Sequence, residues 1–240
     1  MKPRQIVFQR ASSWMRFSLD FIPLDRLLQP LKPGNLIMLK GQGASAIAEV
    51  LAFRAQLPPE RGGLDSGAFF IDGGNRSDPY LLASLARPYF IDPRRALRRV
   101  TNCRLFTMYQ LAGLLSSGRI VDMASSYGCK LVVLADLLGM FNEPDANQVE
   151  IDRLLAAVHL GLLATKRKLV VVTTLGSPNK HDGLVSDWAD TLMQLSPLLG
   201  NRTRGALLRH PTKKPDASVF ALSELLFHPD SLAWQKAVAR

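Results

Sequence analysis

The chain has 240 residues, of which 47% are apolar and 21% are charged, a composition typical of one globular domain with short appendages. Thirty lysines and arginines against twenty aspartates and glutamates give a formal net charge of +10, which suggests a polyanionic partner: nucleic acid first, then an acidic protein or an anionic membrane. No apolar run approaches the roughly 18–20 residues that span a bilayer, and no secretory segment follows the basic N-terminus, so we expect a cytoplasmic protein.

The first part of the chain is a basic segment followed by a strand–loop–helix unit. Residues 1–20 carry only isolated apolar side chains, so we interpret them as an arm ahead of the core. A short helix is expected over 21–28, and the apolar run 36–39 predicts the first strand. After a glycine-containing loop, apolar residues recur at three- and four-residue intervals and predict a helix over 45–56.

Strands and helices continue to alternate along the rest of the chain. Asp78 followed by Pro79 predicts a helix start, because a carboxylate caps the first turn and proline fits its first position. Thr107 is expected to cap one long helix that Gly128 ends. From about residue 190, shorter runs separated by turns indicate an antiparallel extension. The other expected elements are strand 68–71, helix 80–86, strand 103–106, helix 107–127, strand 130–134, helix 149–165, strand 169–173 and strands 191–195, 205–209 and 218–222.

This order of elements predicts a three-layer α/β fold with a mainly parallel sheet and an antiparallel C-terminal extension. Continuous apolar runs such as 130–134 are typical of strands that helices cover on both faces. We expect one core domain over 21–228 and a tail over 229–240. Cys103 and Cys129 lack metal-ligand spacing, so the sequence predicts buried thiols and no metal site.

The loop after the first strand has the layout of a phosphate-binding loop. In the pattern G-x-x-x-x-G-K-[ST], backbone N–H groups and the helix N-terminus hold an anion. Counting from Gly41, the last two positions are Ile47 and Ala48, so the lysine and the hydroxyl are absent. Gly41, Gly43 and Ser45 still offer backbone amides to a nucleotide, and the alternative is a plain strand-to-helix turn.

The order and spacing of these segments resemble the core of RecA/RadA-type recombinases and their paralogs, over roughly residues 20–225. The entry 22–36 reads IPLDRLLQPLKPGNL and leads into the glycine loop as it does in that family. Residues 131–141 resemble the Walker B strand, and the pieces 191–195 and 204–208 resemble the terminal hairpin. The resemblance implies a RecA-like ATPase core.

The same resemblance identifies catalytic positions that this sequence fills differently. The lysine that neutralises the β/γ-phosphates and the hydroxyl that holds Mg²⁺ correspond to Ile47 and Ala48. Gly74 stands nearest the position of the glutamate that activates water, and the Walker B aspartate corresponds to Asp136, or to Ala135 if the register moves by one residue. Losing several such groups together predicts that the chain does not hydrolyse ATP and needs no cofactor, although ATP binding stays open. The candidate nucleotide-binding residues are Gly41, Gly43, Ser45 and Asp136.

Two loops hold DNA in the family, one after the Walker B strand and one after the next strand. The first corresponds to 142–148, which carries no basic residue, and the second to 176–183, which contains Lys180. Other basic residues gather at 94–99, at 166–168, which we interpret as a solvated surface, and on the late hairpin, where we expect phosphate contacts. The predicted DNA-binding residues are Arg202, Arg204, Arg209, Lys213, Lys214 and Lys180.

The N-terminal arm contains a second motif implied by the resemblance. Phe8 and Ala11 match the F-x-x-A pattern with which recombinases of this family insert into a neighbouring subunit. They predict a subunit contact in a homo- or hetero-oligomer, and the alternative is an ordinary edge segment.

The sequence therefore predicts a non-catalytic recombinase paralog that acts as an accessory or mediator in homologous recombination and DNA repair. It would bind single- or double-stranded DNA and a recombinase or paralog partner, and would then lie with the DNA in the nucleus or nucleoid. Two alternatives stay open. One is a divergent DNA-dependent ATPase that borrows a cation such as Lys40, and the other is a protein-only scaffold subunit whose basic surface meets an acidic partner.

Overall fold

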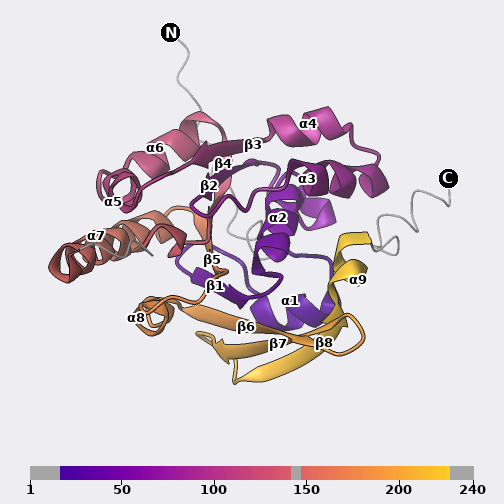
Figure 1. The fold of residues 1–240 in the computed structure, drawn as a ribbon. Coiled ribbons are helices and arrows are strands. Elements are labelled where there is room, and N and C mark those ends of the chain that lie inside the picture. Colours follow the sequence, from indigo (N-terminus) through magenta and orange to yellow (C-terminus); the bar gives the residue numbers. More distant parts are fainter. Residues whose placement is uncertain (1–16, 142–146, 228–240) are drawn as a thin grey trace, which may run out of the picture.

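A computed structural model describes residues 17–141 and 147–227, and within them one eight-stranded sheet runs through the molecule (Figure 1). Its strands are β1 Leu36–Gly41, β2 Gly67–Asp72, β3 Val100–Arg104, β4 Cys129–Ala135, β5 Val170–Leu175, β6 Thr191–Leu198, β7 Arg202–Arg209 and β8 Asp216–Ala221. Their order across the sheet is β3-β2-β4-β5-β1-β6-β7-β8. The first six strands in this order, from β3 at the edge to β6, pair in parallel. Strands β7 and β8 pair antiparallel to their neighbours. The predicted mainly parallel sheet with an antiparallel C-terminal extension is confirmed.

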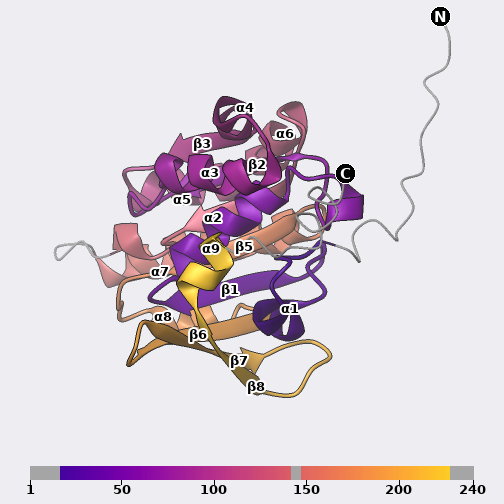
Figure 2. The same ribbon diagram turned by 90° about the vertical axis from the view of Figure 1, so that its right-hand side faces the viewer.

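Helices cover both faces of this sheet (Figures 1 and 2). One face packs against α1 Ile22–Leu28, α2 Ala44–Arg54, α3 Pro79–Ala86, α4 Pro93–Arg98 and α9 Leu222–Phe227. The other packs against α5 Met108–Ser116, α6 Arg119–Ser126, α7 Gln148–Lys166 and α8 Asp182–Ser186. The three-layer α/β architecture expected from the sequence is therefore present. None of the described helices is long and apolar enough to cross a membrane.

Successive side chains of the central strands point to opposite faces of the sheet, and both faces are covered, which explains why these sequences are continuously apolar. In β1, Ile37 and Leu39 pack with α2 in one cluster, while Leu36 and Met38 pack with α7 in the other. Every residue of β2 and β5 is buried. The valine, leucine, isoleucine and phenylalanine side chains among them each contribute roughly 1.5–3 kcal/mol when they are fully buried.

Several helix ends follow the predicted capping chemistry. The Asp78 carboxylate accepts hydrogen bonds from the N–H groups of Tyr80 and Leu81 at the start of α3. The Thr107 hydroxyl accepts one from the Gln110 N–H at the start of α5. Gly128, with a φ of 65°, follows the last helix of this unit as expected.

Three expectations were wrong in detail. The helix expected over 107–127 is two helices, because Gly118 takes a left-handed φ of 71° and starts α6. Strand β3 spans 100–104 rather than 103–106, since an edge strand tolerates the polar residues at 101 and 102 that mask its periodicity. Helix α4 was not expected, although Asp92 caps it just as Asp78 caps α3.

The end of the predicted N-terminal arm lies against the core. Phe17 and Leu19 are buried in the same cluster as α2, and the Ser18 N–H donates to the Gly62 carbonyl. Residues 17–20 therefore pack with the domain that we expected to begin at residue 21. The motif residues Phe8 and Ala11 and the tail 229–240 lie outside the described residues.

Candidate functional site

The glycine loop after β1 is short. Only Gln42 and Gly43 separate the end of β1 from α2, which begins at Ala44. The last five positions of the eight-residue phosphate-binding pattern, 44–48, therefore lie within the helix. Ser45 lies half-buried in the first helical turn.

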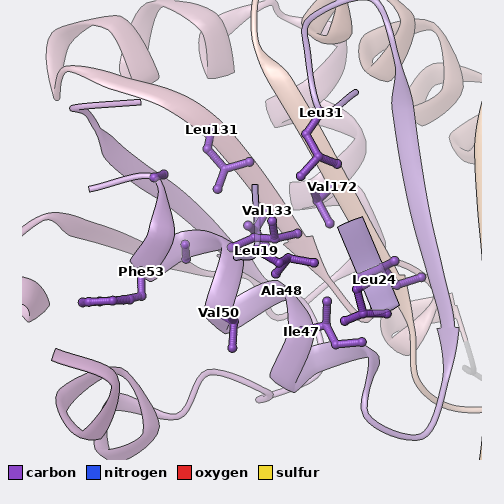
Figure 3. Close-up of a cluster of buried hydrophobic side chains, with 14 of the residues drawn as sticks. Leu19, Leu24, Leu31, Ile47, Ala48, Val50, Phe53, Leu131, Val133 and Val172 are labelled. Carbon is purple, nitrogen blue, oxygen red and sulfur yellow. The ribbon is translucent and has the colours of Figure 1, made fainter. Parts of the chain in front are cut away.

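The two positions that correspond to the catalytic lysine and hydroxyl lie in the apolar core. Ile47 and Ala48 are fully buried, and Figure 3 shows Ile47 beside Leu24 of α1 and Ala48 among the side chains of the central cluster. Val133 and Val172 from β4 and β5 belong to the same cluster. These positions hold helix α2 on the sheet, and neither side chain can contact a phosphate or a metal ion.

Close packing accounts for both loop glycines. Gly41 has a φ of 98°, and a Cβ there would lie 2.2 Å from the Leu195 carbonyl oxygen of β6. Gly43 has a φ of 93°, and a Cβ there would lie 2.7 Å from the Leu222 side chain of α9. The left-handed backbone and these contacts require glycine at both positions without any ligand. Leu222 also lies directly at the N-terminal end of α2, where a phosphate would have to approach.

Asp136 lies at the end of β4 in a polar cluster of its own. Its carboxylate Oδ2 lies 3.1 Å from both Nε and Nη2 of Arg76, and its Oδ1 accepts a hydrogen bond from the Gly176 N–H. A Cβ on Gly74 would lie 2.5 Å from the same carboxylate, so glycine at that position makes room for Asp136. Asp136 thus contacts the loops after β2 and β5, and the contacts around Gly41 and Gly43 come from β6 and α9. The grouping of Gly41, Gly43, Ser45 and Asp136 into one nucleotide site stays a prediction.

Lys40 is directed to the opposite face from helix α2. Its neighbour Leu39 packs with α2, and the alternation of the strand places Lys40 on the other face, where its Nζ lies 3.0 Å from the Asp182 carboxylate of α8. The alternative in which Lys40 supplies the missing loop cation gains no support from this geometry.

Glu49 is a buried carboxyl group that the sequence analysis did not single out. It lies in α2 with 1% of its surface exposed, and its Oε1 accepts a hydrogen bond from the Asp78 N–H at 2.8 Å. Burial raises the pKa of Glu49 to about 7, and the carboxylates of Asp78 and Asp72 add to that rise. A carboxyl group flanked on both sides by apolar residues of α2 was the available signal.

The predicted DNA-binding residues divide into two groups. Arg202 and Arg204 alternate along β7 with the buried residues Thr203 and Gly205, so both arginines project from the exposed face of the β6–β7–β8 extension. Lys214 is exposed in the turn that follows β7. The side chains of this group are exposed to solvent, and their contact with DNA stays a prediction.

The other basic residues make contacts within the chain. Arg209 donates hydrogen bonds to the carbonyls of Ser186, Asp187 and Ala189 and forms an ion pair with Asp187, which fixes the end of α8. The Lys213 Nζ donates to the Arg26 carbonyl, and burial lowers the pKa of this lysine.

Lys180, in the loop after β5, donates to the Gln148 side chain at 2.9 Å. Most of the other predicted DNA loop, 142–146, lies outside the described residues.

The structure also describes both cysteines and the possible metal ligands. Cys129 is buried and Cys103 is half-buried, both as free thiols, and burial raises the pKa of each. In the ranges 17–141 and 147–227, no group of three or more histidine, cysteine, aspartate or glutamate side chains is arranged to hold a metal ion.

Comparison with known proteins adds one finding. A protein-family model described as Rad51 matches residues 38–159, slightly more than half of the 240-residue chain. The matched segment runs from β1 through the glycine loop, β2 and β4 into α7. The extension formed by β6, β7 and β8 lies beyond it. The resemblance to RecA/RadA-type recombinases is thereby confirmed.

Proposed function

Because the chain belongs to the Rad51 family, and is therefore a recombinase-family protein of recombination and repair, we propose that it serves there as a non-catalytic, DNA-binding paralog. In this role it binds the phosphate backbone through the exposed face of β7 and acts as an accessory to a recombinase or another paralog. Neither step requires ATP hydrolysis.

The observation that carries the proposal is the placement of Arg202 and Arg204. Both lie on the solvent-facing side of a strand whose other side is buried, so their guanidinium groups project outward from the sheet. Guanidinium groups bind phosphate oxygens in a fixed, often bidentate geometry. A chain with a net charge of +10 further attracts a polyanion over long range.

The loop geometry supports the absence of ATP turnover. Ile47 and Ala48 face the core, Leu222 lies over the start of α2, and Arg76 neutralises Asp136. Phosphoryl transfer depends on a lysine, a metal ion and a positioned water acting together at one place. The residues that stand at those positions here stabilise the fold.

The test compares Arg202→Gln/Arg204→Gln with Arg119→Gln/Arg167→Gln, an equal charge change at exposed residues on α6 and after α7. Binding of labelled oligonucleotides is measured over a range of salt concentrations. For single strands, loss of two phosphate contacts makes the slope of log K against log salt shallower by about 1.4. An equal effect of both double variants would show that β7 has no special role.

The same surface favours a second candidate role, contact with a protein partner. Leu198, Leu208 and Val219 of the extension are 44–52% exposed, and Leu199 at the β6–β7 turn is 97% exposed. Exposed apolar side chains beside arginines are typical of protein interfaces. Leu199→Ser/Leu208→Ser should then weaken capture of a recombinase subunit while leaving DNA affinity unchanged, and loss of DNA affinity alone would exclude this role.

A further inference from the structure

A cavity of about 330 Å³ lies at the end of the molecule opposite the β6–β7–β8 extension. It lies between the turn after α2 and residues 91–99, which include α4. Helix α4 packs beside β3 at the far edge of the sheet (Figure 1). Its volume is at the lower end of the roughly 300–1,000 Å³ of small-ligand sites. The residues that matter for its chemistry are Leu57, Arg61, Asp65, Ile91, Arg95 and Arg99.

The walls of the cavity are fixed by buried polar contacts. Arg54, at the end of α2, is only 2% exposed and donates to the Arg61 carbonyl, the Ser18 carbonyl and the Tyr89 hydroxyl. The Gln56 side chain donates to the Ala96 carbonyl at 3.0 Å and so ties the turn to α4. Both sides of the cavity are therefore held in place without a ligand, as expected of a preformed site.

The lining carries an excess of positive charge. Three arginines face one carboxylate, and Asp65 approaches only Arg99 of the three, at 3.5 Å. Arg94 and Arg98, exposed on α4, extend the charge outside the cavity. The positive charges around the cavity repel one another, and a bound anion would reduce this repulsion. The planar guanidinium group of arginine matches the geometry of a phosphate group.

The rest of the lining is apolar. Leu57 is buried and Ile91 is half-buried. They offer an apolar surface to the uncharged part of a ligand whose anionic group binds the arginines. Phe90, the residue before Ile91, is 77% exposed with a left-handed φ of 56°. Phe90 thus adjoins the lining in the sequence, and an exposed aromatic ring can stack on an unpaired base. An acidic protein segment would use the arginines but not the aromatic ring.

We propose that this cavity binds a backbone phosphate of a single-stranded nucleic acid, with Arg61, Arg95 and Arg99 as ligands and Phe90 as a stacking platform. The inference is independent of the proposed role of β7, because the two surfaces belong to opposite edges of the sheet. A chain with both surfaces can hold nucleic acid at two separate places.

The experiment measures fluorescence anisotropy of a labelled single-stranded oligonucleotide with the full chain. Arg95→Gln/Arg99→Gln is expected to weaken binding about tenfold and to make the salt slope shallower by about 1.4. Arg119→Gln/Arg167→Gln, with the same change in net charge, is the matched control and should have a much smaller effect. Arg202→Gln/Arg204→Gln, measured alongside, reports on the β7 surface, so failure of one site is separable from failure of the other.

Further variants make the outcome specific. Arg95→Gln alone removes an exposed residue and keeps the Arg99–Asp65 pair, so it tests the site even if the double variant fails to fold. Phe90→Leu should weaken binding of a single strand more than binding of a duplex. Equal affinity of the pocket and control variants would overturn the proposal. A labelled mononucleotide that binds as tightly as the strand would also overturn it, in favour of a free-nucleotide site.

Discussion

The guanidinium of Arg76 and the carboxylate of Asp136 form an ion pair at 3.1 Å across the ends of β2 and β4. Asp136 is buried and has a left-handed φ of 53°, and Gly74 and Gly139 leave room for its carboxylate. The Arg76 side chain also donates to the Ser177 hydroxyl. A carboxylate that would otherwise be available to a metal ion is instead neutralised within the chain.

Removing Arg76 should therefore destabilise the fold. Arg76→Gln leaves a buried carboxylate without its cation, and we expect the free energy of unfolding to fall by about 1–3 kcal/mol, less than for a fully buried pair because Arg76 is 41% exposed. Urea unfolding measures this, with Arg119→Gln as an exposed control. Equal stability of the two variants would show that the pair contributes nothing.

Restoring the phosphate-binding pattern should not restore the chemistry. Ile47→Lys/Ala48→Ser places an ammonium group among fully buried apolar side chains, and we expect a loss of more than about 3 kcal/mol of stability. Thermal unfolding and an ATPase assay are measured together. A stable variant that hydrolyses ATP would contradict this prediction, because it would require the first turns of α2 to face a bound nucleotide.

Glu49 should make the stability depend on pH. Its pKa is raised from an ordinary 4.5 to about 7 in the folded protein, so between those values the folded chain holds a proton that the unfolded chain has released. The contribution of Glu49 is therefore most favourable below about pH 4.5, falls as the pH rises to about 7 and is constant above that. Glu49→Gln removes this decline, which amounts to roughly 3 kcal/mol between pH 4.5 and pH 7, and should therefore be more stable than the wild type at pH 8. Unfolding at pH 5 and pH 8 checks the sign, since a variant whose advantage is the same at both values would exclude titration of Glu49.

Arg209 should act on stability and not on DNA binding. Its guanidinium contacts three carbonyls at the end of α8, so Arg209→Gln leaves them without a donor and should lower the free energy of unfolding by about 1–3 kcal/mol. The salt slope of DNA binding should be unchanged. A shallower slope at unchanged stability would return Arg209 to the DNA-binding set.

The central strands could be predicted from the sequence because burial on both faces makes them continuously apolar. The strand predicted near β3 had the wrong bounds because no residue of β3 is fully buried, and the short helix α4 was missed because Ala96 is its one buried residue. The Asp92-Pro93 pair was nevertheless a usable signal, identical in chemistry to the Asp78-Pro79 pair that located α3.

The candidate site was harder to predict because its partners are distant along the chain. Asp136 pairs with Arg76 sixty residues away, and Arg209 contacts residues about twenty positions earlier. The sequence shows which residue types are present, and only the fold shows which charges are already neutralised. The glycine pattern had the same limitation, because a left-handed backbone at Gly41 and Gly43, and close packing of Gly41 against the Leu195 carbonyl, favour glycine without a phosphate.

The most direct test of a DNA-binding protein without ATP chemistry is the affinity of the wild-type chain for labelled single- and double-stranded DNA, with and without ATP and Mg²⁺, at two salt concentrations. We predict binding that weakens steeply with salt and is the same with and without the nucleotide. Binding that appears only when ATP and Mg²⁺ are present would contradict this account, because it would require a working nucleotide site at the start of α2.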